Sequence, residues 1–291
     1  MSGQARKDTV DVLGIDFTST PSRRKPLVVA HCQLTGAALR LTRLEPLYTF
    51  AEFEHLLQRP GPWIAAMDFP FGQARRFVEG VGWPAAWADY VATTARLDRP
   101  GFRQLLEHYK AARPAGDKEH RRATDVKAGS ISPQKLYGVP VALMFFEGAP
   151  RLLAANVTVP GLHSGDAQRI VVEGYPGIAA RCLIGRRSYK SDDRARQGAA
   201  QLLARCDILS ALIEQAPTRY GFTVEAPESI CEDPGADRLD ALLCSVQAAW
   251  AWRQRHQNFG APADLDALEG WIADPCIGEP AAVLIDRKAC A

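Results

Sequence analysis

The chain has 291 residues, 47% of them hydrophobic, and its 35 lysines and arginines nearly balance its 33 aspartates and glutamates, for a net charge of +2. This length fits one large domain or two small ones with an ordinary globular core. The balanced charge excludes the broad basic field of proteins that track long stretches of nucleic acid, so any nucleic-acid contact is expected to be local.

The sequence contains no run of about 18 apolar residues, which a membrane-spanning helix would need. Residues 1–8 lack the apolar stretch of a signal peptide. The seven cysteines are scattered and include no C-x-x-C pair, so free thiols in a reducing compartment are expected. These features predict a soluble cytoplasmic protein.

Three strands are predicted at the start of the chain. Residues 11–17 form an apolar run followed by hydroxyl residues, which is typical of a buried strand that opens into a turn. After a basic turn at residues 22–25, residues 26–33 predict a second strand, and residues 38–44 alternate apolar and basic side chains. The alternation indicates a hairpin with one solvated face.

A short helix and a second strand ending in Asp follow. Thr49 and Glu52 have the spacing of a capping box, and the apolar residues after them keep helical spacing to about residue 58. Residues 63–67 are an apolar run that ends in Asp68, before a Phe-Pro-Phe-Gly turn. This layout repeats the one in which Asp16 ends the first strand.

The middle of the chain is less regular. Residues 73–108 have a mostly helical pattern, and residues 113–133 predict a polar loop with a basic cluster. For residues 136–155 the pattern leaves helix and strand both open. A third apolar run, residues 170–172, delivers Glu173 to a turn rich in Gly and Pro.

Two helices are predicted in the last third of the chain. The first covers residues 191–215, and the second runs from Asp237 to about residue 255, with a face of small residues that permits close packing against a sheet. Because there is no internal repeat, we expect a single domain over residues 8–275, with a helical and loop insertion at about 73–165 and a C-terminal tail at 276–291.

Acidic residues mark the ends of these elements. Three apolar runs end in Asp16, Asp68 and Glu173, and the last helix begins with Asp237 and Asp240. Each has a simpler explanation, since Asp favours turns, N-caps and the first turn of a helix. In an open α/β sheet, however, ligands collect at the carboxyl ends of the strands, which is where the three strand-ending acids would meet.

Carboxylates that converge would raise one another's pKa unless a cation neutralised them. Ligation by oxygen atoms alone suits Mg²⁺ or Mn²⁺. A pair of such ions clamps the attacking water and the leaving oxygen of an in-line phosphoryl displacement, so the expected reaction is phosphodiester hydrolysis.

The order of these segments resembles the ribonuclease H-like superfamily, whose α/β fold is a mixed sheet flanked by helices. Residues 237–242, Asp-Arg-Leu-Asp-Ala-Leu, look like the corresponding segment of RuvC-type Holliday-junction resolvases. A closer resemblance, over nearly the whole chain, is to family 429 of the domains of unknown function, which is regarded as a family of predicted nucleases. The matching blocks are residues 14–16, 66–72, 172–176, 239–241 and 269–272.

The resemblance implies a nuclease with a nucleic acid or nucleotide as substrate. Asp16, Asp68, Glu173 and Asp240 would be the catalytic, metal-binding carboxylates, with Asp237 as a fifth ligand. Asp16 would bridge two Mg²⁺ or Mn²⁺ ions, and Asp240 with either Glu173 or Asp68 would complete the two sites.

Five further residues are expected to contact substrate phosphates, although a basic surface side chain often serves only as a solvated group. They are Thr18, Ser19, Arg122, Lys127 and Lys190.

Two other classes of protein fit the sequence. An actin-like or sugar-kinase-like ATP-dependent phosphotransferase also has an Asp before a hydroxyl-rich turn, but such proteins duplicate the core and carry a second Gly-rich phosphate turn, and the chain shows neither. A non-catalytic scaffold that keeps the fold would have no reason to crowd acids together. The sequence has neither a P-loop nor a G-x-S-x-G nucleophile motif.

Overall fold

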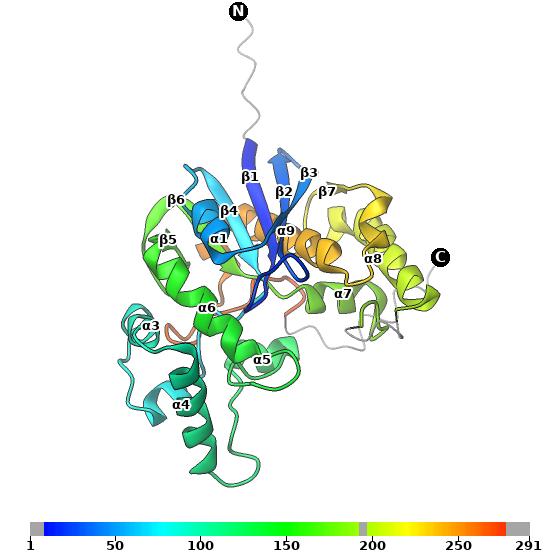
Figure 1. Cartoon of the computed structure of the whole chain (residues 1–291). Helices are drawn as coiled ribbons and strands as arrows, with labels where there is room; N and C mark the ends of the chain where they lie inside the picture. The colour runs from blue at the N-terminus through cyan, green and yellow to red at the C-terminus, as the bar shows by residue number, and fades with distance from the viewer. Residues whose placement is uncertain (1–8, 192–196, 278–291) are drawn as a thin grey trace, which may run out of the picture.

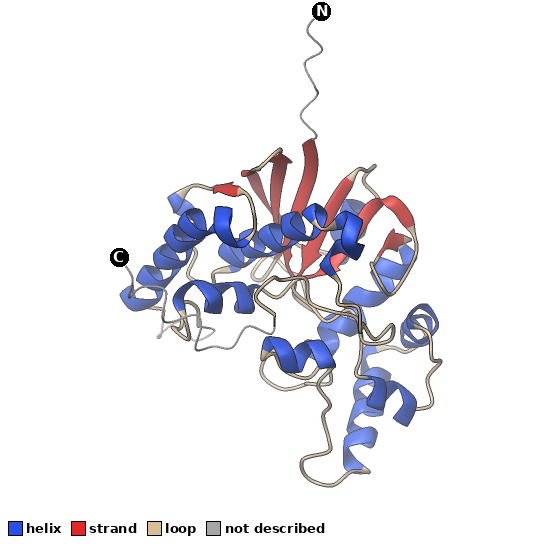
Figure 2. Cartoon of the chain, turned by 180° about the vertical axis from the view of Figure 1, so that it is seen from behind, coloured by secondary structure: helices blue, strands red, loops and turns tan. Residues whose placement is uncertain are grey.

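The computed structural model describes residues 9–191 and 197–277, which form a seven-stranded mixed sheet with helices on both faces (Figures 1 and 2). The strands are β1 (Thr9–Asp16), β2 (Leu27–Thr35), β3 (Ala38–Leu47), β4 (Trp63–Met67), β5 (Val157–Thr158), β6 (Asp166–Glu173) and β7 (Thr223–Glu225). The helices are α1 (Phe50–Leu57), α2 (Arg75–Gly80), α3 (Trp87–Ala95), α4 (Arg99–Ala111), α5 (Ala123–Ala128), α6 (Val141–Ala154), α7 (Pro176–Ile184), α8 (Ala199–Arg219) and α9 (Asp237–Arg253), with 3-10 helices η2 (Glu228–Glu232) and η3 (Arg255–Gly260). The expected α/β class, a mixed sheet flanked by helices, is confirmed.

The strand order across the sheet is β5-β6-β4-β1-β2-β3-β7. β1, β2 and β3 form an antiparallel meander, whereas β4 and β6 extend the sheet from β1 in parallel. Ile15 of β1 lies opposite Met67 of β4, and Met67 lies opposite Glu173 of β6. The carboxyl ends of these three strands therefore lie at one edge of the sheet, which brings Asp16, Asp68 and Glu173 to that edge.

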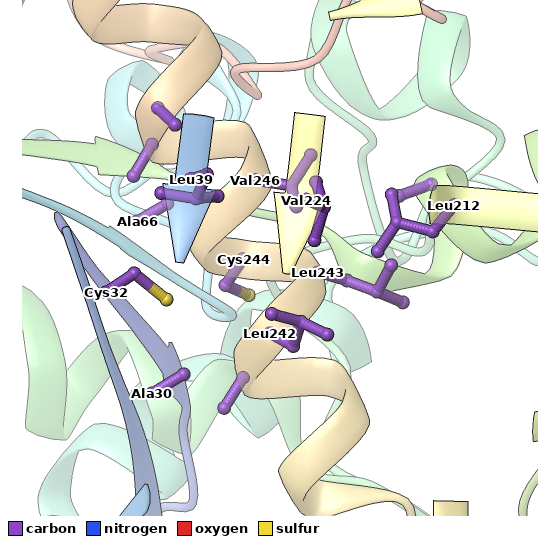
Figure 3. Packing of buried hydrophobic residues seen from close by; sticks show 14 of the residues in the cluster. Ala30, Cys32, Leu39, Ala66, Leu212, Val224, Leu242, Leu243, Cys244 and Val246 are labelled. Carbon is purple, nitrogen blue, oxygen red and sulfur yellow. The ribbon is translucent and has the colours of Figure 1, made fainter. Parts of the chain in front are cut away.

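Alternate strand residues pack into two separate hydrophobic cores, because successive side chains of a strand point to opposite faces of the sheet. Val12 and Ala30 belong to the core that the sheet forms with α7, α8 and α9. Leu13 and Val29, one position along each strand, belong to the core formed with α1, α3, α4 and α6. Figure 3 shows part of the first core, in which apolar side chains of α9 lie beside side chains of the sheet.

Helix α9 crosses β1 at Gly14. A Cβ atom at this position would lie 1.9 Å from the carbonyl oxygen of Ala241 and 2.2 Å from the backbone nitrogen of Ser245. Only a residue without a side chain permits so close an approach of two backbones. The small residues of α9 thus meet the central strand of the sheet, and this contact holds the first turn of α9 beside the end of β1.

Two expectations from the sequence are wrong in detail, and one open question is settled. The helix expected over residues 191–215 is α8, which begins only at Ala199, while residues 192–196 lie outside the described part of the chain. In the backbone before α8, the carbonyl oxygen of Tyr189 accepts a hydrogen bond of 2.9 Å from the side chain of Arg205. The loop expected over residues 113–133 contains α5, and the undecided residues 136–155 contain α6.

A helical lobe lies between β4 and β6 in the chain and comprises α2 to α6. In Figure 1, α3, α4 and α5 lie beyond the carboxyl ends of β1 and β4. Arg99 at the start of α4 donates to the backbone oxygen of Ser19 at 2.7 Å and to Glu147 of α6 at 2.9 Å. The lobe therefore contacts the turn that follows Asp16. Over residues 9–191 and 197–277, no helix has the length and apolarity needed to cross a membrane.

Candidate functional site

Asp16 and Asp68 are the strand-end carboxylates of β1 and β4. Asp16 is the last residue of β1 and its side chain is buried. Asp68 directly follows β4, and its backbone nitrogen donates to the carbonyl oxygen of Ile15 at 3.0 Å. Because β1 and β4 are neighbouring parallel strands, the two aspartates lie side by side at the edge of the sheet.

Helix α9 brings Asp240 and Asp237 to the same edge. Asp240 is fully buried and receives a hydrogen bond of 2.7 Å from the hydroxyl of Tyr189, while the ammonium of Lys190 binds its other carboxylate oxygen. Asp237, one turn earlier, pairs with Lys25 at 2.6 Å. Four aspartates from three separate segments and two lysines thus form one cluster, which we call the aspartate cluster.

Burial and repulsion from neighbouring carboxylates raise the pKa values of Asp16 and Asp68. Burial raises the pKa of Asp16 well above its ordinary value, and the charges of Asp240, Asp237 and Asp68 raise it further, against the opposing charge of Lys190. Burial also raises the pKa of Asp68 to about 7, with Lys190 opposing the shift and Asp240 and Glu173 adding to it. Ionising these two carboxyls without a cation is therefore unfavourable, and a bound divalent cation would favour their charged forms.

The raised pKa of Asp68 gives a prediction about stability. Between about pH 4 and pH 7 the folded protein binds more protons at Asp68 than the unfolded chain does, so this carboxyl lowers the free energy of unfolding increasingly as the pH rises through that range. In EDTA, we expect Asp68→Asn to raise the melting temperature more at about pH 8 than at about pH 5.5. Thermal unfolding by circular dichroism measures this difference.

The exposed carboxylate Asp207, which pairs with Arg187 on the surface, supplies the control for that measurement. Asp207→Asn should change the melting temperature little and equally at both pH values, because surface ion pairs contribute little. If Asp68→Asn behaves in the same way, the Asp68 carboxyl is not desolvated as described.

Glu173 lies at the same edge, where the side chain of Arg122 and the backbone of Phe71 hold its two oxygens. The guanidinium of Arg122 donates to them at 2.7 and 2.5 Å, and the backbone nitrogen of Phe71 donates at 2.8 Å. Arg122 also binds Asp125 through two hydrogen bonds of 2.8 and 2.9 Å, and all three side chains are buried. Burial raises the pKa of Glu173, while the charge and hydrogen bonds of Arg122 oppose that shift. Glu173 is therefore part of an ion-pair triad, Asp125-Arg122-Glu173.

Of the five residues expected to contact phosphate, the structure brings Lys190 into the aspartate cluster. Arg122 is only 1% exposed and binds the triad carboxylates, so it does not offer its guanidinium to a substrate. Lys127 lies on the surface and pairs with Asp264 at 3.5 Å. Thr18 is half-buried, and the buried hydroxyl of Ser19 accepts a hydrogen bond from Arg99 at 3.3 Å, so the turn after β1 is tied to the helical lobe.

Sequence reasoning missed three contributors to the site. Lys25 had a visible signal, because it stands in the basic turn directly after the first Asp-ended strand. Gly14 also had one, since a glycine within an apolar strand marks a close approach of another backbone. Tyr189 had none, because its partner Asp240 is distant in the sequence and only the fold brings the two together.

The donor atoms of the aspartate cluster fit a hard divalent cation, because they are carboxylate oxygens gathered in a buried site. No three acidic, histidine or cysteine side chains in the described ranges already stand close enough to hold a metal ion. Mg²⁺ keeps several of its water ligands and needs only one or two protein carboxylates, so it does not require a complete protein cage. Asp16, Asp68 and Asp240 are the residues that would hold it.

Comparison with known proteins shows the family of the chain. The model of the family described as protein of unknown function (DUF429) matches residues 14–264, and the chain belongs to this family. The matched region includes Asp16, Asp68, Glu173, Asp237 and Asp240. Searches of curated proteins and of solved structures gave no significant match.

Proposed function

We propose that this protein is a divalent-metal-dependent hydrolase of phosphodiester bonds in nucleic acids. The observation that carries the proposal is the aspartate cluster, in which four carboxylates, at the end of β1, after β4 and in the first turn of α9, lie near one another and beside two lysines. The mixed sheet, with three antiparallel strands followed by parallel ones, agrees with the ribonuclease H-like arrangement that the sequence resembles. Buried acids cost stability, so their gathering at the usual ligand-binding edge of an α/β sheet favours a function.

Each residue of the cluster has a role in this proposal. Asp16, Asp68 and Asp240 would bind Mg²⁺ or Mn²⁺, and Asp237 lies one helical turn outside them. A bound ion would activate water and stabilise the leaving oxygen. The hydroxyl of Tyr189 orients the Asp240 carboxylate. The ammonium of Lys190, whose side chain is 44% exposed, would hold a phosphate oxygen of the substrate.

The ion-pair triad contacts the turn that carries Asp68. Glu173 accepts a hydrogen bond from the backbone of Phe71, three residues after Asp68, and Arg122 fixes Glu173 in turn. We therefore propose that Glu173 positions the turn that carries Asp68, and that the metal ligands are the aspartates.

Calorimetric titration with Mn²⁺ and Mg²⁺ tests the proposal. We expect the wild-type protein to bind metal, and Asp16→Asn and the double variant Asp16→Asn with Asp240→Asn to lose binding while they stay folded by circular dichroism. Asp207→Asn, which removes an exposed carboxylate elsewhere, is the matched control and should bind metal like the wild type. A screen of single-stranded, duplex and branched DNA and RNA should then show metal-dependent cleavage that the double variant lacks.

Other outcomes point to the other two classes of protein. If the wild type binds no metal at millimolar concentration, the hydrolase proposal is wrong and a non-catalytic scaffold is favoured. Metal binding that needs ATP to be present would favour a phosphotransferase instead.

A further inference from the structure

Two basic segments flank the aspartate cluster. The first is the turn between β1 and β2, closed by a hydrogen bond of 3.0 Å from the nitrogen of Ser22 to the oxygen of Lys25. Arg23, Arg24 and Lys25 are exposed, and the ammonium of Lys25 reaches Asp237 while its side chain stays 50% exposed. The second segment, after α7, presents Lys190 to Asp240.

The two lysines serve the same carboxylates from different parts of the chain. The charge of Lys190 acts on both Asp16 and Asp68, and the charge of Lys25 also acts on Asp68. Both lysine side chains are partly exposed, at 50% and 44%, whereas Asp16 and Asp240 are buried, at 6% and 0%. Arg23 and Arg24 are exposed and precede Lys25 in the same turn, so they add positive charge beside it in the sequence.

This arrangement suits an anion that carries several charges along its length. Lysine binds phosphate as a point charge and arginine binds it through paired donors. Lys25 and Lys190 bind different aspartates, one helical turn apart, so a polynucleotide, which has a phosphate on each side of the bond to be cut, can offer a separate phosphate to each lysine. Because the carboxylates are recessed, a flexible single strand can bend a phosphate toward them more easily than a stiff duplex can.

We propose that Arg23, Arg24 and Lys25 on one side and Lys190 on the other bind the sugar-phosphate backbone of a single-stranded nucleic acid across the aspartate cluster. This inference rests on the proposed function, since it specifies the substrate of that site. The binding itself does not need a metal ion, because the basic segments belong to the protein.

The test is fluorescence anisotropy with a labelled single-stranded DNA or RNA of about 12 nucleotides, in EDTA. The protein carries Asp16→Asn and Asp68→Asn, which prevents cleavage. Adding Arg23→Ala with Arg24→Ala should weaken binding at least about tenfold and flatten the salt dependence of log K by about 0.7 for each phosphate that the protein no longer neutralises. Arg40→Ala with Arg43→Ala, which removes two exposed arginines of β3, is the matched control and should change binding less than about twofold.

The proposal is overturned if the Arg23 and Arg24 variant binds like the control, or if a dinucleotide or a duplex of equal length binds as tightly as the single strand. These outcomes are distinguishable from failure of the hydrolase proposal. Single-strand binding that depends on Arg23 and Arg24 in a protein that binds no metal would leave the binding surface standing and remove the hydrolase.

Discussion

Replacing Arg122 by Met should destabilise the protein by about 3–5 kcal/mol, because the change leaves Asp125 and Glu173 buried without their counter-charge. Arg122 is 1% exposed and donates four hydrogen bonds to these two carboxylates and one to the backbone oxygen of Glu269. Met has a similar length and cannot neutralise either acid. Urea denaturation at about pH 8 measures the decrease in stability.

Arg121 provides the matched control, since it is the exposed neighbour of Arg122. Arg121→Met should change the free energy of unfolding by less than about 0.5 kcal/mol. Adding Asp125→Asn and Glu173→Gln to Arg122→Met should recover a large part of the stability, because the uncompensated charges are then removed. Equal stability of Arg121→Met and Arg122→Met would show that the triad is not desolvated.

Gly14→Ala should cost more than about 3 kcal/mol of stability or prevent folding, because the new methyl group would overlap the backbone of α9. The atoms in its way are the carbonyl oxygen of Ala241 at 1.9 Å, the nitrogen of Ser245 at 2.2 Å and the Cα of Ser245 at 2.9 Å. None of these is a flexible side-chain end, so α9 itself must move away from β1. Any protein that folds should therefore also have Asp240 displaced from Asp16 and bind divalent metal more weakly.

Gly198→Ala is the control for this substitution. Gly198 is exposed and has a negative φ of −106°. A Cβ atom added there would lie 3.7 Å from Oε1 of Gln201, which is an ordinary contact distance. Its replacement should change stability by less than about 1 kcal/mol in thermal or urea denaturation. If Gly14→Ala is as mild as Gly198→Ala, then α9 does not pack on β1 as closely as the structure has it.

Arg122 and Gly14 both support the aspartate cluster. The triad around Arg122 holds β6 and the turn after Asp68, and the close approach at Gly14 holds the start of α9. A cluster of buried acids destabilises the fold, so the surrounding structure must fix it in place. The same reasoning explains why Asp68→Asn is expected to stabilise the metal-free protein while removing a proposed metal ligand.

The sequence by itself determined the local elements and the residues at their ends. Alternation and turn residues located β1, β2 and β3, and the capping box of Thr49 and Glu52 located α1. Apolar runs ending in an acid identified Asp16, Asp68 and Glu173, because a buried strand must end where polar residues begin. These signals are local, so they can be read without knowing what packs against each segment.

Only the tertiary structure decided the partners of those residues. Arg122 and Lys190 both looked like surface bases that could bind phosphate, yet one is buried between Asp125 and Glu173 and the other pairs with Asp240 in the aspartate cluster. A basic side chain can pair with any acid within its reach, and its choice depends on which distant segments the sheet order and the crossing of α9 at Gly14 bring together. Charge pairing in this protein is therefore a property of the assembled fold.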